Sequence, residues 1–276
     1  MSPEQTQVPE LHPEDQALRE EIARLRASLT LLLLQKDDLL LIQNRRIEAA
    51  YLRRFGALEL KVYESWCDCL RAKRKARLLR AGANRRERAD PERIERQLDE
   101  ELAEYREKLE KRFQKVAGVM EKREGPGLSA GGQKELKSLF RQAVKGLHPD
   151  LHPNESLQHA ELLDQAMRAY RSGDLNGLRA ICETMEPAGE RACDTLEELR
   201  AELRRLRMNL RTQDRELEHL KQSYPYNARV YLEDEEKGRG REAELTEQLR
   251  ELRARTARYE EEIAALTAPE EGEEAP

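Results

Sequence analysis

Leucine and other apolar residues recur at alternating spacings of three and four along much of the chain. Near the N-terminus the series is Leu18, Ile22, Leu25, Leu29 and Leu32. A stricter series towards the C-terminus is Leu196, Leu199, Leu203, Leu206, Leu210, Leu217 and Leu220, with only Gln213 interrupting the register. This spacing places the apolar side chains on one stripe of a helix and is typical of a coiled-coil seam. The pattern therefore predicts long helices joined through narrow apolar seams.

Glycine and proline gather at a few joints, and these joints divide the helical pattern. Gly82–Asn84 and Asp90-Pro91 separate a first helix from a second, and Pro91 is well placed to open the second. Gly125–Gly127 is expected to form a hinge loop that Gly131-Gly132 extends. The expected helices are 16–81, 94–120, 133–147, 154–171 with Asn154 as N-cap, a short helix capped by Asp174 after a stop at Gly173 and ending before Pro187, 196–220 and 245–266.

Two apolar seams occupy the C-terminal third of the chain, one on each side of a break at Ser223–Asn227. They are of similar length, so they could fold back on each other as an antiparallel hairpin. They could equally pair between two chains as a homodimer. The spacing alone leaves both arrangements open.

Composition favours this elongated helical architecture over a compact core. Of the 276 residues 38% are charged and only 4% are aromatic, with a single tryptophan, Trp66. The 50 basic and 55 acidic residues are well interleaved and give a net charge of −5, which argues against a nucleic-acid coat. Regular leucine spacing argues against a disordered chain.

The cysteines and the N-terminus lead us to expect a protein of the reducing cytoplasm. Cys67, Cys69, Cys182 and Cys193 follow no zinc-ligand or redox spacing, so ordinary thiols are expected. The N-terminus begins acidic and has no signal-peptide pattern. The apolar stretches Leu29–Leu34 and Leu39–Ile42 are far shorter than the roughly 20 residues that span a bilayer, so no membrane association is expected.

Residues 133–171 carry more specific information than the seams. At 100° per residue, four cations fall on one stripe of the helix 133–147, and an apolar face lies opposite. The cations are Lys134, Lys137, Arg141 and Lys145; the apolar residues are Leu136, Leu139, Phe140, Ala143 and Leu147. The helix runs into His148-Pro149-Asp150, where proline cannot continue it. A second amphipathic helix follows, so the segment predicts an antiparallel helical hairpin, with Phe140, Met167 and Tyr170 in its core.

This hairpin resembles helices two and three of a J domain. In that family a basic helix leads into a His-Pro-Asp loop and an Ala-Tyr pair ends the partner helix, as Ala169-Tyr170 does here. The tripeptide alone is a weak signal: Leu11-His12-Pro13-Glu14 is nearly the same string, but no basic amphipathic helix precedes it. The resemblance covers residues 134–170.

The resemblance implies a contact with a DnaK-type chaperone. His148, Pro149 and Asp150 would form the loop that stimulates ATP hydrolysis by that partner, and Lys134, Lys137, Arg141 and Lys145 would meet its acidic surface. The chain departs from the family in lacking the usual Tyr-rich first helix, for which the end of the 94–120 helix could substitute. It also has no Gly/Phe-rich linker, Cys-x-x-Cys zinc module or substrate-binding β domain, which argues against a client-holding chaperone of the full-length type.

The expected protein is therefore all-α, with elongated coiled-coil helices flanking a small J-domain-like hairpin. The expected regions are a disordered N-terminus (1–15), an N-terminal helical region with a basic run (16–90), the J-domain-like module (91–187), C-terminal coiled-coil helices (188–268) and a disordered acidic tail (269–276). The expected function is a non-enzymatic co-chaperone whose arms bind a client or dimerise.

Two other functions remain open. The hairpin could be a spacer in a coiled-coil scaffold, with the loop an ordinary helix-ending turn. The basic run between Arg71 and Arg88 could contact RNA or a ribosome, although no aromatic residues are interleaved with it and pairing with acidic neighbours is the simpler interpretation.

Catalytic, cofactor and metal sites are not expected. His152 and His159 follow His148 but lack a convincing third ligand set. No nucleophile elbow, Cys/His pairing or P-loop spacing is present.

Overall fold

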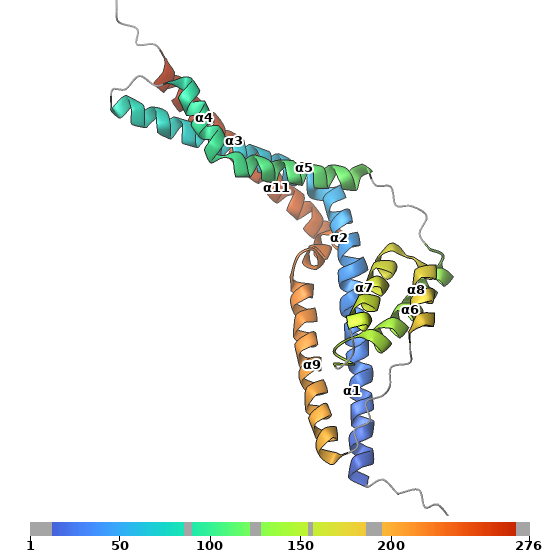
Figure 1. The fold of residues 1–276 in the computed structure, drawn as a ribbon. Helices are drawn as coiled ribbons and strands as arrows, with labels where there is room; N and C mark the ends of the chain where they lie inside the picture. The colour runs from blue at the N-terminus through green and yellow to red at the C-terminus, as the bar shows by residue number, and fades with distance from the viewer. Residues whose placement is uncertain (1–12, 86–89, 122–127, 154–156, 186–194, 269–276) are drawn as a thin grey trace, which may run out of the picture. The chain divides into compact units, whose positions relative to one another are not determined.

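The structure is a computed structural model and describes residues 13–85, 90–121, 128–153, 157–185 and 195–268. Within these ranges every regular element is a helix, which confirms the all-α class (Figure 1). None of the helices in these ranges combines the length and apolar character needed to cross a membrane. The chain forms two compact units.

Unit 1 comprises residues 1–46 and 125–227. Its elements are α1 (Pro13–Asp38), the π-helical η1 (Leu39–Gln43), the start of α2 (Asn44–Tyr51), α6 (Ala130–Leu147), α7 (Leu157–Ser172), α8 (Leu175–Thr184), α9 (Leu196–Gln222) and the start of η3 (Tyr226–Arg229). Unit 2 comprises residues 47–124 and 228–276, with the remainder of α2 and η3, the π-helical η2 (Leu52–Gly56), α3 (Ala57–Asn84), α4 (Pro91–Glu101), α5 (Ala103–Glu121), α10 (Val230–Glu233) and α11 (Glu235–Thr267).

In unit 1 the leucine seam of α9 packs against α1 (Figure 1). Thr195 begins α9 with a capping box, in which its side chain accepts from Glu198 N–H and the Glu198 carboxylate accepts from Thr195 N–H. The seam residues Leu199, Leu203 and Leu206 are buried together with Ile22, Leu29 and Leu33 of α1. The sequence left the partner of this seam open, and the structure pairs it with the N-terminal helix.

One charged group is buried in this helix pair. Glu202 is only 3% exposed, and its carboxylate accepts hydrogen bonds from Arg26 at 3.0 Å and from Arg205 at 2.7 Å. A buried carboxylate needs such partners, because desolvation of an unpaired charge is costly. The two guanidinium groups hold the pKa of Glu202 below its usual value.

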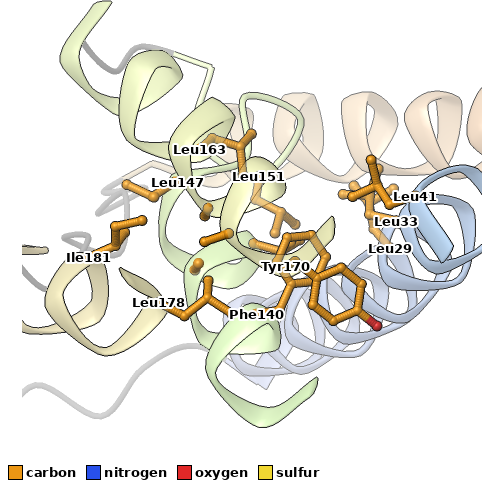
Figure 2. Close-up of a cluster of buried hydrophobic side chains, with 14 of the residues drawn as sticks. Leu29, Leu33, Leu41, Phe140, Leu147, Leu151, Leu163, Tyr170, Leu178 and Ile181 are labelled. Atoms are coloured by element: carbon orange, nitrogen blue, oxygen red, sulfur yellow. The ribbon is translucent and has the colours of Figure 1, made fainter. Parts of the chain in front are cut away.

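Helices α6, α7 and α8 form a small helical module on the same core. Phe140 and Tyr170 stack with ring centroids 4.2 Å apart, which confirms both as core residues (Figure 2). Gly173 has a φ of +76° and ends α7, and Asp174 then caps α8 by accepting from Gly177 N–H at 2.9 Å. Both features match the sequence-based expectation.

Two expectations about helix boundaries are wrong. Gly131 and Gly132 were expected in a loop, but both lie in α6, because the Ser129 hydroxyl accepts from Gly132 N–H at 3.1 Å and begins the helix earlier. The helix expected over 94–120 is divided at Leu102 into α4 and α5. The expected hinge at Gly125–Gly127, the Asn154 cap and Pro187 lie outside the described residues.

In unit 2 the long helices α3 and α11 pack together. The buried residues of α3 are Cys69, Ala72, Ala76 and Leu79, which are mostly small. At one end of the pair an aromatic group forms between Tyr51, Phe55 and Tyr231. As in unit 1, the C-terminal seam is paired with an N-terminal helix.

Candidate functional site

The His-Pro-Asp loop begins where α6 ends. His148 leaves the helical conformation, with φ −74° and ψ 128°, which is the conformation that a following proline favours. The backbone then turns back, and the N–H groups of Leu151 and His152 donate to the His148 carbonyl at 2.9 and 3.0 Å. Leu151 is buried in the module core. The loop is therefore an ordered turn that is anchored at both ends.

The imidazole of His148 is held in its neutral form. Asp150 N–H donates to His148 Nδ1 at 3.1 Å, so that nitrogen must be unprotonated. Burial lowers the pKa of His148, against a smaller opposing effect of the Asp150 charge. His152 Nε2 lies 2.8 Å from the Lys145 carbonyl oxygen, to which it can only donate. The two histidines therefore fix the loop rather than converge on a common ligand.

Helix α9 contacts the same loop through polar side chains. Gln213 Nε2 donates to Asp150 Oδ2 at 2.9 Å, and Arg205 Nη1 donates to the Asp150 carbonyl oxygen at 2.7 Å. Asn209 Nδ2 lies 3.5 Å from the same carbonyl oxygen. Asp150 is half-buried as a result, whereas Pro149 remains exposed.

The four cations of α6 point away from the core. Lys134, Lys137, Arg141 and Lys145 are all exposed, as the helical wheel predicted. Lys137 Nζ lies 4.0 Å from Asp38 Oδ1, a distance at the limit of an ion pair. In the described part of the chain no carboxylate pairs with the other three. The stripe is thus a cationic surface next to the loop.

A groove lies beside this stripe, between α1, α6 and α9. It has a volume of about 490 Å³, and its lining includes Asp38, Lys137, Arg141 and Lys221. Tyr170 donates its hydroxyl to Asp38 Oδ1 at 2.7 Å, and burial together with this bond raises the pKa of Tyr170. The groove joins apolar side chains of the core to the cationic stripe.

The seven residues expected at the site lie along α6 and the loop at its end, with Lys134 in the first turns of the helix and Lys145 next to the loop. The structure adds residues that sequence reasoning missed. These are Arg205, Asn209 and Gln213 of α9, together with Asp38 of α1. The sequence did contain a signal for Gln213, because it is the residue that interrupts the leucine register of α9.

The basic run in α3 is largely engaged within unit 2. Arg71 bonds to Glu95 and Asp99, Arg74 to Glu101, Lys75 to Glu95 and Arg80 to Glu262. This is the pairing with acidic neighbours that the charge pattern predicted. Arg86 and Arg88 lie outside the described residues.

The described residues contain no cluster of three or more His, Cys, Asp or Glu side chains that could hold a metal ion. Cys67, Cys69 and Cys182 are free thiols, and burial is the main cause that raises the pKa of Cys67 and Cys182. Cys193 lies outside the described ranges.

No protein-family model, curated protein or solved structure matches this chain. The resemblance to J domains consequently rests on the sequence of residues 134–170 alone.

Proposed function

We propose that this protein is a co-chaperone that stimulates ATP hydrolysis by a DnaK-type chaperone through the loop His148–Asp150. The observation that carries the proposal is the combination of an ordered His-Pro-Asp turn with an exposed cationic stripe on the helix that precedes it. Cations aligned beside a constrained loop favour fast, oriented docking on an acidic surface.

The ATPase chemistry belongs to the chaperone in this proposal. The chain contributes binding groups: Asp150 as a charged hydrogen-bond acceptor, and Lys134, Lys137, Arg141 and Lys145 as the docking surface. The helix pairs of the two units would hold a client or a second copy of the chain. Such a co-chaperone would act in the cytoplasm.

The test is single-turnover ATP hydrolysis by a purified DnaK-type chaperone, with and without the full chain. We expect stimulation by the wild type, and its loss in His148→Gln. His219→Gln, which changes an exposed histidine on α9, is the matched control and should stimulate like the wild type. Circular dichroism should show equal helicity for all three proteins.

One observation favours a structural role for the loop instead. Asp150 is already bonded to α9 inside the chain, as a joint between a helical module and a scaffold would be. In that case changes at His148–Asp150 would leave ATP hydrolysis unaffected, whereas Leu203→Asp or Leu206→Asp would disrupt assembly. Equal stimulation by the wild type and His148→Gln would end the co-chaperone proposal.

A further inference from the structure

A polar stripe on α9 covers the loop. Arg205, Asn209 and Gln213 are spaced four residues apart, so they lie in one row along the helix, next to the buried leucine seam. We call this row the α9 clamp. All three of its side chains face Asp150.

The orientation of the Gln213 amide is set by a second contact. Lys36 Nζ of α1 donates to Gln213 Oε1 at 2.7 Å, so the amide oxygen points to the lysine and Nε2 points to Asp150. Lys36 also pairs with Glu216. The donor that meets the Asp150 carboxylate is therefore held in place by the helix pair rather than free to rotate.

A partner can reach the cationic stripe of α6, but the α9 clamp covers part of Asp150. Lys134, Arg141 and Lys145 are exposed and available to an acidic partner, whereas Asp150 Oδ2 and the Asp150 carbonyl oxygen are occupied. An acidic partner can thus be attracted to α6 before it reaches the loop carboxylate.

A docked partner could displace Gln213 from the Asp150 carboxylate. Gln213 is a neutral amide, so its bond to the carboxylate lacks the Coulomb attraction that a cationic donor would add. An arginine or lysine on a docked partner could therefore replace Gln213 at Asp150.

We propose that the α9 clamp inhibits the loop: it withholds Asp150 from the chaperone, and release of the loop from α9 activates the co-chaperone. This inference rests on the proposed function and concerns the regulation of that same site. When only a fraction of the molecules has an open loop, the apparent affinity for the chaperone is reduced by that fraction.

The test uses the full chain with Gln213→Glu. This change keeps the size of the side chain and the contact with Lys36, but it places a carboxylate against the carboxylate of Asp150. Thr212→Glu is the control, because it adds the same charge at the adjacent, exposed position of α9. Gln213→Leu removes the donor without adding charge and continues the leucine register, so it covers the case in which Gln213→Glu fails to fold.

The first measurement is the concentration of each protein that half-saturates stimulation of single-turnover ATP hydrolysis. We expect this concentration to fall about tenfold for Gln213→Glu, in the same direction for Gln213→Leu, and to stay unchanged for Thr212→Glu. An unchanged or higher value for both Gln213 variants would overturn the inference, since α9 would then be inert or would position the loop for binding.

The second measurement is hydrogen exchange of the loop amides, which needs no chaperone. Leu151 N–H and His152 N–H are bonded to the His148 carbonyl, and we expect them to exchange faster in both Gln213 variants. Unchanged exchange would also overturn the inference. If exchange accelerates but neither the wild type nor any variant stimulates hydrolysis, the proposed function itself fails.

Discussion

In unit 1, helices α1 and α9 meet through leucines, and the buried cluster extends into α6, α7 and α8. In unit 2, helices α3 and α11 meet through mostly small side chains on α3. The buried cluster of unit 2 is smaller and contains Tyr51, Phe55, Ala228 and Leu245. Leucine and phenylalanine bury far more apolar area than alanine does, so the hydrophobic contribution is larger in unit 1.

Ion pairs also join the helices of unit 2. Arg54 bonds to Glu235 at 3.0 Å and to Glu242 at 2.9 Å, and Arg241 bonds to Glu59 at 3.0 Å. These pairs are partly exposed, so each contributes little and salt weakens them. Unit 1 has such pairs too, because Lys36 pairs with Glu216 and Arg207 with Glu21 across α1 and α9. The candidate site is therefore built on the unit with the larger buried apolar cluster.

Among substitutions that test this difference between the units, the largest loss of stability is expected from Phe140→Ala in unit 1. Phe140 is 2% exposed and stacks on Tyr170, so its removal should cost about 3–5 kcal/mol of unfolding free energy. Phe113→Ala, at a 54% exposed position of α5, should change stability by less than about 0.5 kcal/mol.

Urea unfolding can assign the Phe140 effect to a unit. Circular dichroism at 222 nm reports helices in both units, whereas the fluorescence of the single tryptophan, Trp66, reports unit 2. We expect Phe140→Ala to shift the circular-dichroism midpoint more than the fluorescence midpoint. Equal midpoints for Phe140→Ala and Phe113→Ala would contradict a leucine- and phenylalanine-based core in unit 1.

A stabilising change of intermediate size is expected from Asp37→Asn, also in unit 1. Burial raises the pKa of Asp37 from 3.8 to about 6, against a smaller opposing effect of Lys36. Because the folded pKa is the higher one, this carboxyl destabilises the fold progressively as the pH rises from about 4 to 6, and the full penalty is present above pH 6. At pH 7.5 asparagine should therefore stabilise the chain by up to about 3 kcal/mol.

The measurement is the melting temperature of both proteins at pH 7.5 and pH 5. The gain from Asp37→Asn should shrink at pH 5, where the wild-type carboxyl is mostly protonated in the folded state. Asp214→Asn, at an exposed position of α9, serves as the control and should leave the melting temperature nearly unchanged. A gain that is equal at both pH values would mean that ionisation of Asp37 is not its cause.

Local chemistry explains which features of the fold were predictable from the sequence. Pro91 opens α4 behind the Asp90 cap, and Asp174 caps α8, because both devices act over three or four residues. Gly131 and Gly132 were misassigned because the cap at Ser129 outweighs the low helix propensity of glycine. Leucine spacing defines a stripe but not its partner, so the pairing of α9 with α1 had to come from the structure.

The candidate site also has one part that the sequence predicts and one part that it does not. The loop His148–Asp150 and the cations of α6 are neighbours in sequence, and their arrangement follows from one helix and its end. The contacts of Asp150 with Arg205 and Gln213 span 55 and 63 residues, a range over which periodicity carries no information. A polar residue inside an otherwise apolar register was the only local sign of that contact.

The smallest effect is expected in unit 2, from Arg241→Ala. This side chain bonds to Glu59 and Glu244 and lies 3.3 Å from the Tyr51 hydroxyl, so its loss should cost about 1.5 kcal/mol of unfolding free energy.

Arg250→Ala is the control. It removes a local pair with Glu247 in which the arginine side chain is 78% exposed, so it should cost less than about 0.5 kcal/mol. For the two arginine variants the readout is urea unfolding followed by Trp66 fluorescence at low and at 1 M salt, because Trp66 lies in the same unit. Because salt screens exposed ion pairs, the cost of Arg241→Ala should decrease at 1 M salt. The cost of Phe140→Ala, followed by circular dichroism at 222 nm because Phe140 lies in unit 1, should not decrease. A cost of Arg241→Ala that is unchanged at 1 M salt would mean that its ion pairs do not stabilise unit 2.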